Sequence, residues 1–339
     1  MCNPPGRTLR KGPLPARISR VMVRVIRKVH TKEARATSSG SFPGSTMLRY
    51  HQCPMPPAPG SCVLPTTLRA VTISRTRTGA RASADGIRFA FGTLTVLPVR
   101  VTRWDREAAR AGMLWAPLAG LVVGLAAAAA GGLFWLLGAG PLLAAVASAS
   151  VPAVLTRGLH LDGLADTADG LGSGRPAEDA LRIMKQSDIG PFGVVTLLFA
   201  LLAQVAALHE LYAAGGWAYG MAGAAVTGTV ARLALTLASR ASVPAARPEG
   251  LGAVVAGTVP VRWALAVTVL VLVAAAGAGA ALGGPYGALR HALAAGVALA
   301  AAQWLLGRCV RRFGGVTGDV FGAVEETAAT AALVVLTFG

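Results

Sequence analysis

The sequence predicts an all-α fold, a polytopic membrane helix bundle with about six or seven transmembrane helices. Of the 339 residues, 54% are hydrophobic and only 14% are charged, and the mean hydropathy is +0.57. An average soluble protein has about 25% charged residues, so this composition suits a chain that lipid largely solvates. Apolar stretches long enough to cross a bilayer recur along the chain, and the loops between them alternate in basic content. We expect one membrane-embedded domain over residues 85–339.

Residues 1–84 differ from the rest of the chain, and we expect them to form a separate, disordered extension. They hold 15 of the 32 Lys and Arg residues but only one of the 15 acids. They are rich in Arg, Pro, Ser and Thr without a sustained apolar period, so they cannot bury enough surface to offset their ordering entropy. A start codon assigned too far upstream would also explain such a segment. Residues 85–339 hold 17 bases against 14 acids, so we expect no nucleic-acid partner for them.

The predicted spans follow a short apolar segment over residues 86–99. This segment cannot cross a bilayer, and an interfacial or re-entrant helix that ends near Pro98 fits it. The second span should bend at Pro152, and the last carries Glu325 and Glu326, so six spans plus one half-buried helix is the alternative count. The seven candidate spans cover residues 113–137, 140–156, 191–214, 217–238, 261–283, 287–307 and 319–338.

Basic residues orient these spans across the membrane. The loops near residues 138–141, 214–217 and 283–290 contain a single basic residue, Arg290. Because basic loops stay on the cytoplasmic side, the other three loops should face the cytoplasm from the cell membrane. Those three loops contain Arg157, Arg175, Arg182, Lys185, Arg240, Arg247, Arg262, Arg308, Arg311 and Arg312.

The first polar loop carries three acids at helical spacing. Asp162, Asp166 and Asp169 stand at i, i+4 and i+7, so a helix would place all three carboxylates on one face. A divalent cation would turn their mutual repulsion into ligation, and oxygen ligands of this kind suit Mg²⁺ or Mn²⁺. Helix capping and solvated loop charges are the alternative explanation. His160 could act as a general base or contact a phosphate, although an interfacial histidine is an equally good interpretation.

The same loop continues into a short amphipathic segment that ends at Lys185. This lysine could neutralise a phosphate, with Ser187 and backbone amides helping at the following helix start, or it could be a cytoplasmic anchor. Arg232 lies inside the fourth span, where either snorkelling or an ion pair with an interior carboxylate or phosphate would explain it.

The third polar loop combines a glycine-rich turn with acids. Gly314, Gly315 and Thr317 could cradle a phosphate through backbone amides and the hydroxyl group. Asp319 could join the metal ligands or orient a hydroxyl, and Glu325, one to two turns later, would be costly to bury alone. A glycine-rich turn by itself is weak evidence for a phosphate site, but this turn lies on the same predicted membrane face as the three aspartates.

Taken together, these motifs resemble the cobalamin synthase family, also called adenosylcobinamide-GDP ribazoletransferase. The resemblance rests on residues 88–98, 157–170, 183–193 and 314–322, covers about residues 85–339 and leaves 1–84 unmatched. One departure is Gln186, which stands where an acid is expected directly after the lysine. The resemblance implies a Mg²⁺-dependent, membrane-embedded catalytic domain for the last step of cobalamin nucleotide-loop assembly. Adenosylcobinamide-GDP and α-ribazole, or its 5′-phosphate, would give adenosylcobalamin, or its 5′-phosphate, and GMP.

The residue-level chemistry is compatible with this reaction. A metal held by the aspartates would bridge the diphosphate, and Arg157 and Lys185 would stabilise charge. Either a carboxylate, such as that of Asp166, or the imidazole of His160 would take the hydroxyl proton. The expected partners are the two substrates and the lipid bilayer, and a homo-oligomer is left open. A CDP-alcohol phosphotransferase is one alternative, but its acidic pattern differs. An ion or metabolite transporter is another, which the placement of the acids in loops disfavours.

Overall fold

The computed structural model describes residues 79–338, and these residues form helices without a β-strand. Backbone pairing outside helices is limited to two isolated bridges, Arg240 with Val259 and Ala245 with Val316. The all-α prediction is confirmed for this part of the chain. The helices are α2 (Gly79–Leu94), α3 (Arg106–Leu136), α4 (Pro141–Leu155), α5 (Leu159–Gly172), α6 (Ala177–Ile183), α7 (Pro191–Ala238), α8 (Gly250–Val255), α9 (Val261–Phe313) and α10 (Gly318–Leu336).

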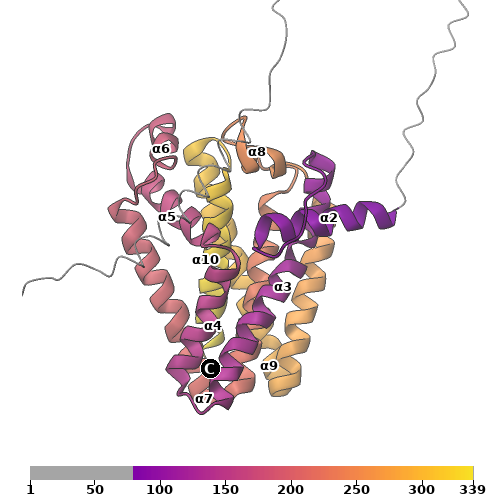
Figure 1. Cartoon of the computed structure of the whole chain (residues 1–339), viewed down its shortest axis with the longest axis vertical. Helices are drawn as coiled ribbons and strands as arrows, with labels where there is room; N and C mark the ends of the chain where they lie inside the picture. Colours follow the sequence, from indigo (N-terminus) through magenta and orange to yellow (C-terminus); the bar gives the residue numbers. More distant parts are fainter. Residues whose placement is uncertain (1–78, 339) are drawn as a thin grey trace, which may run out of the picture. The chain divides into compact units, whose positions relative to one another are not determined.

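The interfacial or re-entrant helix predicted before the first span corresponds to α2. It ends at Leu94, before Pro98, and Figure 1 shows it lying across the long helices rather than along them. Its first residue is Gly79, so the helix begins six residues before the predicted domain boundary. Of the predicted disordered extension, residues 1–78 lie outside the described residues.

The two longest helices are hairpins. A straight helix of the length of α7, 48 residues, would extend about 72 Å, more than twice the thickness of a hydrocarbon core. Instead α7 breaks at Gly216, whose φ of 73° is a backbone conformation that glycine adopts readily. The two arms then pack closely, since a Cβ on Gly220 would overlap the ring of Tyr212 on the preceding arm. In α9 the break lies at Gly283 and Gly284. Each hairpin therefore supplies two antiparallel arms.

These arms match the predicted spans. By length and composition alone, α3, α7 and α9 could cross a membrane, and α4 with α5 counts as a fourth, bent candidate. The breaks in α7 and α9 fall where the sequence predicted short loops, and the last predicted span is α10. Within the described residues, α3, α4, the two arms of α7, the two arms of α9 and α10 correspond to the seven predicted spans, in agreement with the predicted polytopic fold.

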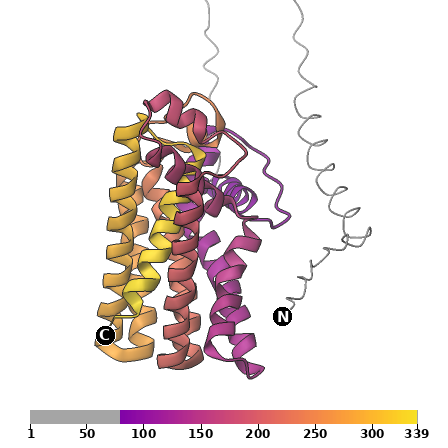
Figure 2. The same ribbon diagram turned by 90° about the vertical axis from the view of Figure 1, so that its left-hand side faces the viewer.

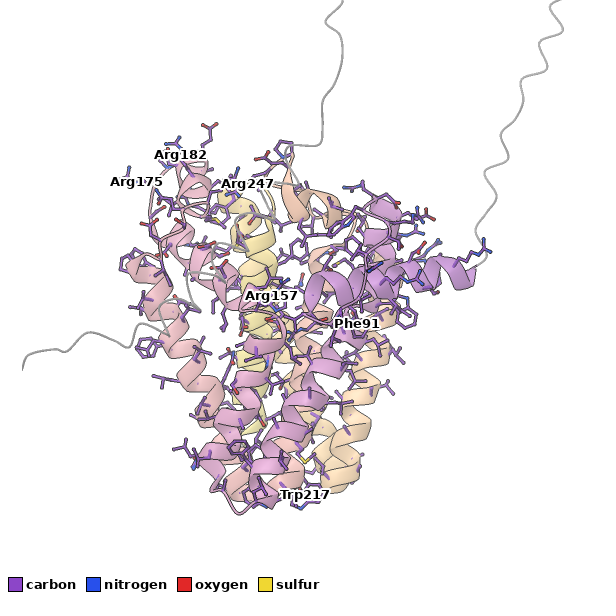
Figure 3. The ribbon with its side chains drawn as sticks, in the orientation of Figure 1. Phe91, Arg157, Arg175, Arg182, Trp217 and Arg247 are labelled. Atoms are coloured by element: carbon purple, nitrogen blue, oxygen red, sulfur yellow. The ribbon has the colours of Figure 1, made fainter. Side chains whose placement is uncertain are left out.

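The two ends of the bundle differ in character. Figures 1 and 2 show the short helices α5, α6 and α8 gathered at one end, while the hairpin turns of α7 and α9 lie at the other. Figure 3 shows Arg175, Arg182 and Arg247 at the first end and Trp217 at the opposite one. Arg106 fastens α8 to this first end by donating to the carbonyls of Ala253 and Ala256, both at 2.8 Å. Arg175, Arg182 and Arg247 thus lie at the end of the bundle that carries α5, α6 and α8.

Candidate active site

A left-handed turn between α4 and α5 sets the position of the acidic helix. Arg157 has a φ of 56°, an unusual backbone conformation for a residue other than glycine, and Gly158 follows with a φ of 71°. The two helices consequently meet at 85°. This bend turns α5 away from the direction of α4 and carries Asp162 and Asp166 with it. Strained backbone of this kind clusters at functional sites.

Close packing of α5 on α10 brings the acids of two loops together. A Cβ on Gly163 would lie 2.6 Å from the carbonyl oxygen of Asp319, and one on Gly322 would lie 2.8 Å from that of His160. The side chains of Asp162 and Asp166 accept no hydrogen bond from the described residues. Burial, followed by the charges of Asp162, Asp319 and Asp169, raises the pKa of Asp166 from its usual 3.8 to about 7. The cluster thus carries more negative charge than its surroundings balance.

Asp169 has a different role from its two neighbours. Its carboxylate accepts hydrogen bonds from the backbone amides of Gly190, at 2.7 Å, and Gly193, at 2.9 Å, and the side chain is buried. It thereby satisfies the first free amides of α7, as acids at helix N-termini commonly do. For Asp169, the alternative explanation of helix capping is therefore correct. Within residues 79–338, no three or more Asp, Glu, His or Cys side chains are placed to hold a metal ion, so the metal site stays a prediction.

The capping role predicts a structural effect for one substitution. Asp169→Asn should destabilise the protein by about 1–3 kcal/mol, because the amide group leaves one of the two glycine amides without an acceptor. Thermal unfolding in detergent would measure it. Asp188→Asn, an exposed acid in the same loop, is the matched control and should leave the midpoint unchanged. Equal midpoints for the two variants would contradict the capping role.

A large cavity opens beside the acidic helix. It has a volume of about 860 Å³, and we call it the outer cavity. Asp162 and Asp166 line it from α5, Arg157 lines it from the turn before α5, and Ser187 lines it from the loop after α6. Trp104, which is 61% exposed, contributes to the wall on the side of α2. The structure thus brings four of the predicted site residues around one cavity.

A second, smaller cavity shares Asp162 with the first. Its volume is about 310 Å³, and we call it the inner cavity. Asp319 and Thr317 line it from the start of α10, and His160 lines it from α5. Arg247 also lines it. The charge of this arginine lowers the pKa of Asp166, but burial and the neighbouring acids raise that pKa by more. The sequence marked Arg247 only as a basic loop residue, because nothing local indicates that α8 folds over the acids.

Lys185 lies outside both cavities. Its ammonium group donates to Glu249 at 2.7 Å, and the two side chains are 53% and 72% exposed. This pair holds the pKa of Glu249 below its usual value and ties the loop after α6 to the start of α8. Glu249 itself lines the inner cavity, and the predicted phosphate and catalytic roles of Lys185 stay predictions.

The glycine-rich turn connects α9 to α10, and of its residues Thr317 lines the inner cavity, whereas Gly314 and Gly315 line neither of the two cavities. Gly314 ends α9 with a φ of 79°, and a Cβ on Gly315 would lie 2.5 Å from the backbone of Ala245. Thr317 begins α10: its hydroxyl accepts from the amide of Val320 at 3.3 Å and donates to Asp319 at 3.1 Å. The predicted phosphate cradle at Gly314 and Gly315 stays a prediction.

An ion pair lies buried between the helices below the acidic cluster. Arg232 pairs with Glu325, and the two side chains are 3% and 1% exposed. The imidazole Nδ1 of His160 lies 3.4 Å from the Arg232 guanidinium and 3.7 Å from the Glu325 carboxylate. Of the two explanations for Arg232, the ion pair with an interior carboxylate is correct. Glu325 consequently serves this pair and lines neither cavity.

A polytopic helix bundle with an acidic double cavity at one end defines a membrane-embedded enzyme. The sequence model of the cobalamin-5-phosphate synthase family matches residues 86–337, and the chain belongs to this family. The match favours the predicted family over the phospholipid-enzyme and transporter alternatives. No solved structure matches the chain.

Curated relatives agree with the family match. The chain is 44% identical over 262 residues to the adenosylcobinamide-GDP ribazoletransferase of Frankia casuarinae. That alignment covers 74% of this chain and 93% of the relative. The corresponding protein of Nocardioides sp. is 41% identical, with 74% and 96% covered. That of Bradyrhizobium diazoefficiens is 39% identical, with 71% and 88% covered.

Proposed function

We propose that this protein joins adenosylcobinamide-GDP to α-ribazole, or to α-ribazole 5′-phosphate. A ribose hydroxyl attacks the phosphorus nearer the cobinamide, and the bond from that phosphorus to the oxygen of the GMP group breaks. The products are adenosylcobalamin, or its 5′-phosphate, and GMP. The observation that carries the proposal is the acidic cluster of Asp162, Asp166 and Asp319 between two cavities, since the reaction needs two substrates to meet at one diphosphate.

The acidic cluster fits Mg²⁺ as a cofactor. Asp162, Asp166 and Asp319 offer only oxygen ligands, and their mutual repulsion is the condition that a divalent cation relieves. Mg²⁺ usually takes one or two carboxylates and fills its remaining positions with water and substrate phosphates, so a fully formed protein cage is not required. When bound, Mg²⁺ would neutralise charge on the diphosphate and on the leaving GMP.

The other residues of the outer cavity would act on the diphosphate directly. Arg157 lines the same cavity as the two aspartates, where its guanidinium can pair with a phosphate oxygen. Ser187 can donate a hydrogen bond from the loop after α6. These contacts would hold the phosphorus in place and balance charge that increases as GMP leaves.

The orientation that fits this function places the cavities on the cytoplasmic side of the cell membrane. Arg175, Arg182 and Arg247 lie at the same end of the bundle as α5 (Figure 3). Basic segments of this kind remain in the cytoplasm during insertion, and soluble nucleotides are available there. Cysteine modification of intact cells would test it: Arg182→Cys should resist an impermeant thiol reagent, and Trp217→Cys should react with it.

Washed membranes provide the direct test of activity. Membranes that contain the protein, supplied with adenosylcobinamide-GDP, α-ribazole and Mg²⁺, should release GMP and form adenosylcobalamin in equal amounts. Membranes from cells without the gene are the control. If neither product rises above the control, the proposed function is wrong.

Removal of the metal should stop the reaction reversibly. EDTA in excess is expected to reduce GMP release to the control level, and Mg²⁺ or Mn²⁺ should restore it, because the oxygen ligands suit both ions. Zn²⁺ at the same concentration should restore less. Full turnover after exhaustive chelation would show that Asp162, Asp166 and Asp319 hold no essential cation.

A further inference from the structure

Two arginines line a pocket that the candidate active site does not use. Its volume is about 260 Å³, it shares no lining residue with the outer or the inner cavity, and we call it the corner pocket. Arg106 and Arg110 line it from the start of α3, and Gly257 and Thr258 line it from the connection between α8 and α9. It therefore lies between the starts of α3 and α9, at the end of the bundle that carries α8 (Figure 1).

The corner pocket carries positive charge that its surroundings do not balance. Arg106 donates only to two carbonyls of the α8 segment and makes no ion pair within residues 79–338. Arg110 is exposed, and within the same residues it makes neither an ion pair nor a hydrogen bond. Glu107 also lines the pocket, but its carboxylate accepts from Arg103 at 3.0 Å. Both pocket arginines are thus available to an anion.

A phosphate group is the anion that these donors fit. Guanidinium groups bind phosphate oxygens through paired N–H donors. The backbone amides of Gly257 and Thr258 have no acceptor within the described residues, so two further donors are available beside the arginines. The Arg106 guanidinium is already held at this turn, since a Cβ on Gly257 would lie 3.7 Å from its Nη2.

The corner pocket lies at the level of the phospholipid headgroups. Trp263, in the first turn of α9, is 53% exposed, and the Arg262 guanidinium lies 5.9 Å from the centre of its ring. Exposed Trp rings gather at the boundary between headgroups and hydrocarbon, and basic side chains flank the cytoplasmic ends of spans. Thr258 comes directly before this turn, so a phosphate in the pocket would lie among the headgroups.

An apolar cleft lies farther along the same two helices. Both α3 and α9 pack on α7 and contact each other little, and the cleft lies between them. Its volume is about 170 Å³, and Leu121, Val271 and Ala274 line it together with residues of the second arm of α7. The hydroxyl of Thr229 in its wall donates to a carbonyl of its own helix at 2.9 Å. The cleft therefore suits a hydrocarbon chain.

The spacing of the pocket and the cleft matches one leaflet of a bilayer. Leu121 lies about 16 Å along α3 from Arg110. A bilayer measures about 20 Å from its midplane to its headgroups, so an acyl chain below a phosphate at Arg110 would reach the cleft. Ala274 is exposed, so the cleft opens on the side of the bundle that lipid covers.

We propose that the corner pocket and the apolar cleft together bind one anionic phospholipid. Its phosphate pairs with Arg106 and Arg110, and one acyl chain runs along α3 into the cleft beside Leu121. Basic pockets between membrane helices on the cytoplasmic side bind acidic headgroups in this way. The site is separate from both active-site cavities, so the proposal does not depend on the proposed function.

Charge and size together select this ligand. A soluble phosphate would leave the cleft empty, and a neutral apolar molecule would leave the two arginines without an anion. A helix from a second copy of the chain is too wide, because a helix with its side chains measures about 10 Å across and the cleft holds only about 170 Å³.

Substitution of the exposed arginine tests the headgroup half of the site. Phosphatidylglycerol is titrated into the purified full-length protein in a neutral detergent, and bound lipid is counted by native mass spectrometry. Arg110→Gln should weaken binding about fivefold, the effect of one basic side chain on an anionic lipid. Arg100→Gln removes the same charge from an exposed position outside the pocket, and it should bind like the wild type. Equal affinity in Arg110→Gln and the wild type overturns the proposal.

Substitution of an alanine tests the acyl-chain half. Ala274→Leu fills the cleft from an exposed position and should weaken the binding of phosphatidylglycerol by a similar factor. Ala266→Leu, exposed on the same arm of α9 but outside the cleft, is the matched control and should have no effect. Phosphatidylcholine, which has no net charge, should bind the wild type more weakly than phosphatidylglycerol does. Equal binding of the two lipids contradicts the selection for an anionic headgroup.

Competition with inorganic phosphate separates a lipid from a soluble anion. Millimolar phosphate should displace little phosphatidylglycerol, because it gains nothing from the cleft. If it displaces the lipid fully, and Ala274→Leu binds like the wild type, the pocket takes a soluble phosphate and the proposal is wrong. None of these measurements requires turnover, so a failure of membranes to release GMP would reject the proposed function and leave the lipid site standing.

Discussion

Asp166→Asn is expected to reduce turnover by about 100- to 1,000-fold, the scale on which a lost charge-stabilising group acts in an active site. The substitution changes almost no volume, and the Asp166 side chain accepts no hydrogen bond from the described residues, so little else is lost. It removes one charge from the cavity that Asp162 and Arg157 also line. GMP release from washed membranes, at equal amounts of protein, measures the effect.

The same substitution should leave the protein at least as stable as the wild type. Burial and neighbouring acids raise the folded-state pKa of Asp166 to about 7, so its ionisation disfavours the folded state. In the wild type this cost appears as pH rises from about 4 to about 7, and it is fully present above that range. The stability gain of Asp166→Asn should therefore be larger at pH 8 than at pH 4, measured by thermal unfolding in detergent.

A neighbouring acid supplies the control for both measurements. Glu178→Gln, on α6 at the same end of the bundle, also removes one negative charge but lines neither cavity. It should change neither turnover nor the pH dependence of stability. Near wild-type turnover in Asp166→Asn would show that Asp166 has no catalytic role.

The sequence correctly predicted the features that follow from the surrounding lipid or from the periodicity of a single helix. Lipid requires long apolar segments, so the arms of the α7 and α9 hairpins could be located to within a few residues, including their breaks at Gly216 and Gly284. Helical periodicity likewise placed Asp162 and Asp166 on one face, and both line the outer cavity.

Features that depend on two distant segments could not be predicted. Asp169 continues the same helical spacing, but the incoming start of α7 takes its carboxylate. Lys185 pairs with Glu249, 64 residues later, and Arg247 reaches the inner cavity only because α8 folds over the bundle. A local pattern of charges cannot distinguish a metal ligand from a cap until the partner helix is placed.

The buried ion pair beneath the site should have the largest effect on stability. Glu325→Ala leaves the Arg232 guanidinium charged and unpaired between the helices, at 3% exposure, and should destabilise the protein by about 3–5 kcal/mol. Arg232→Met with Glu325→Leu removes both charges, so it should recover most of that loss. Thermal unfolding of the wild type and of these two variants in the same detergent would measure both changes in stability. Equal destabilisation in the single and double variants would contradict the ion pair's role.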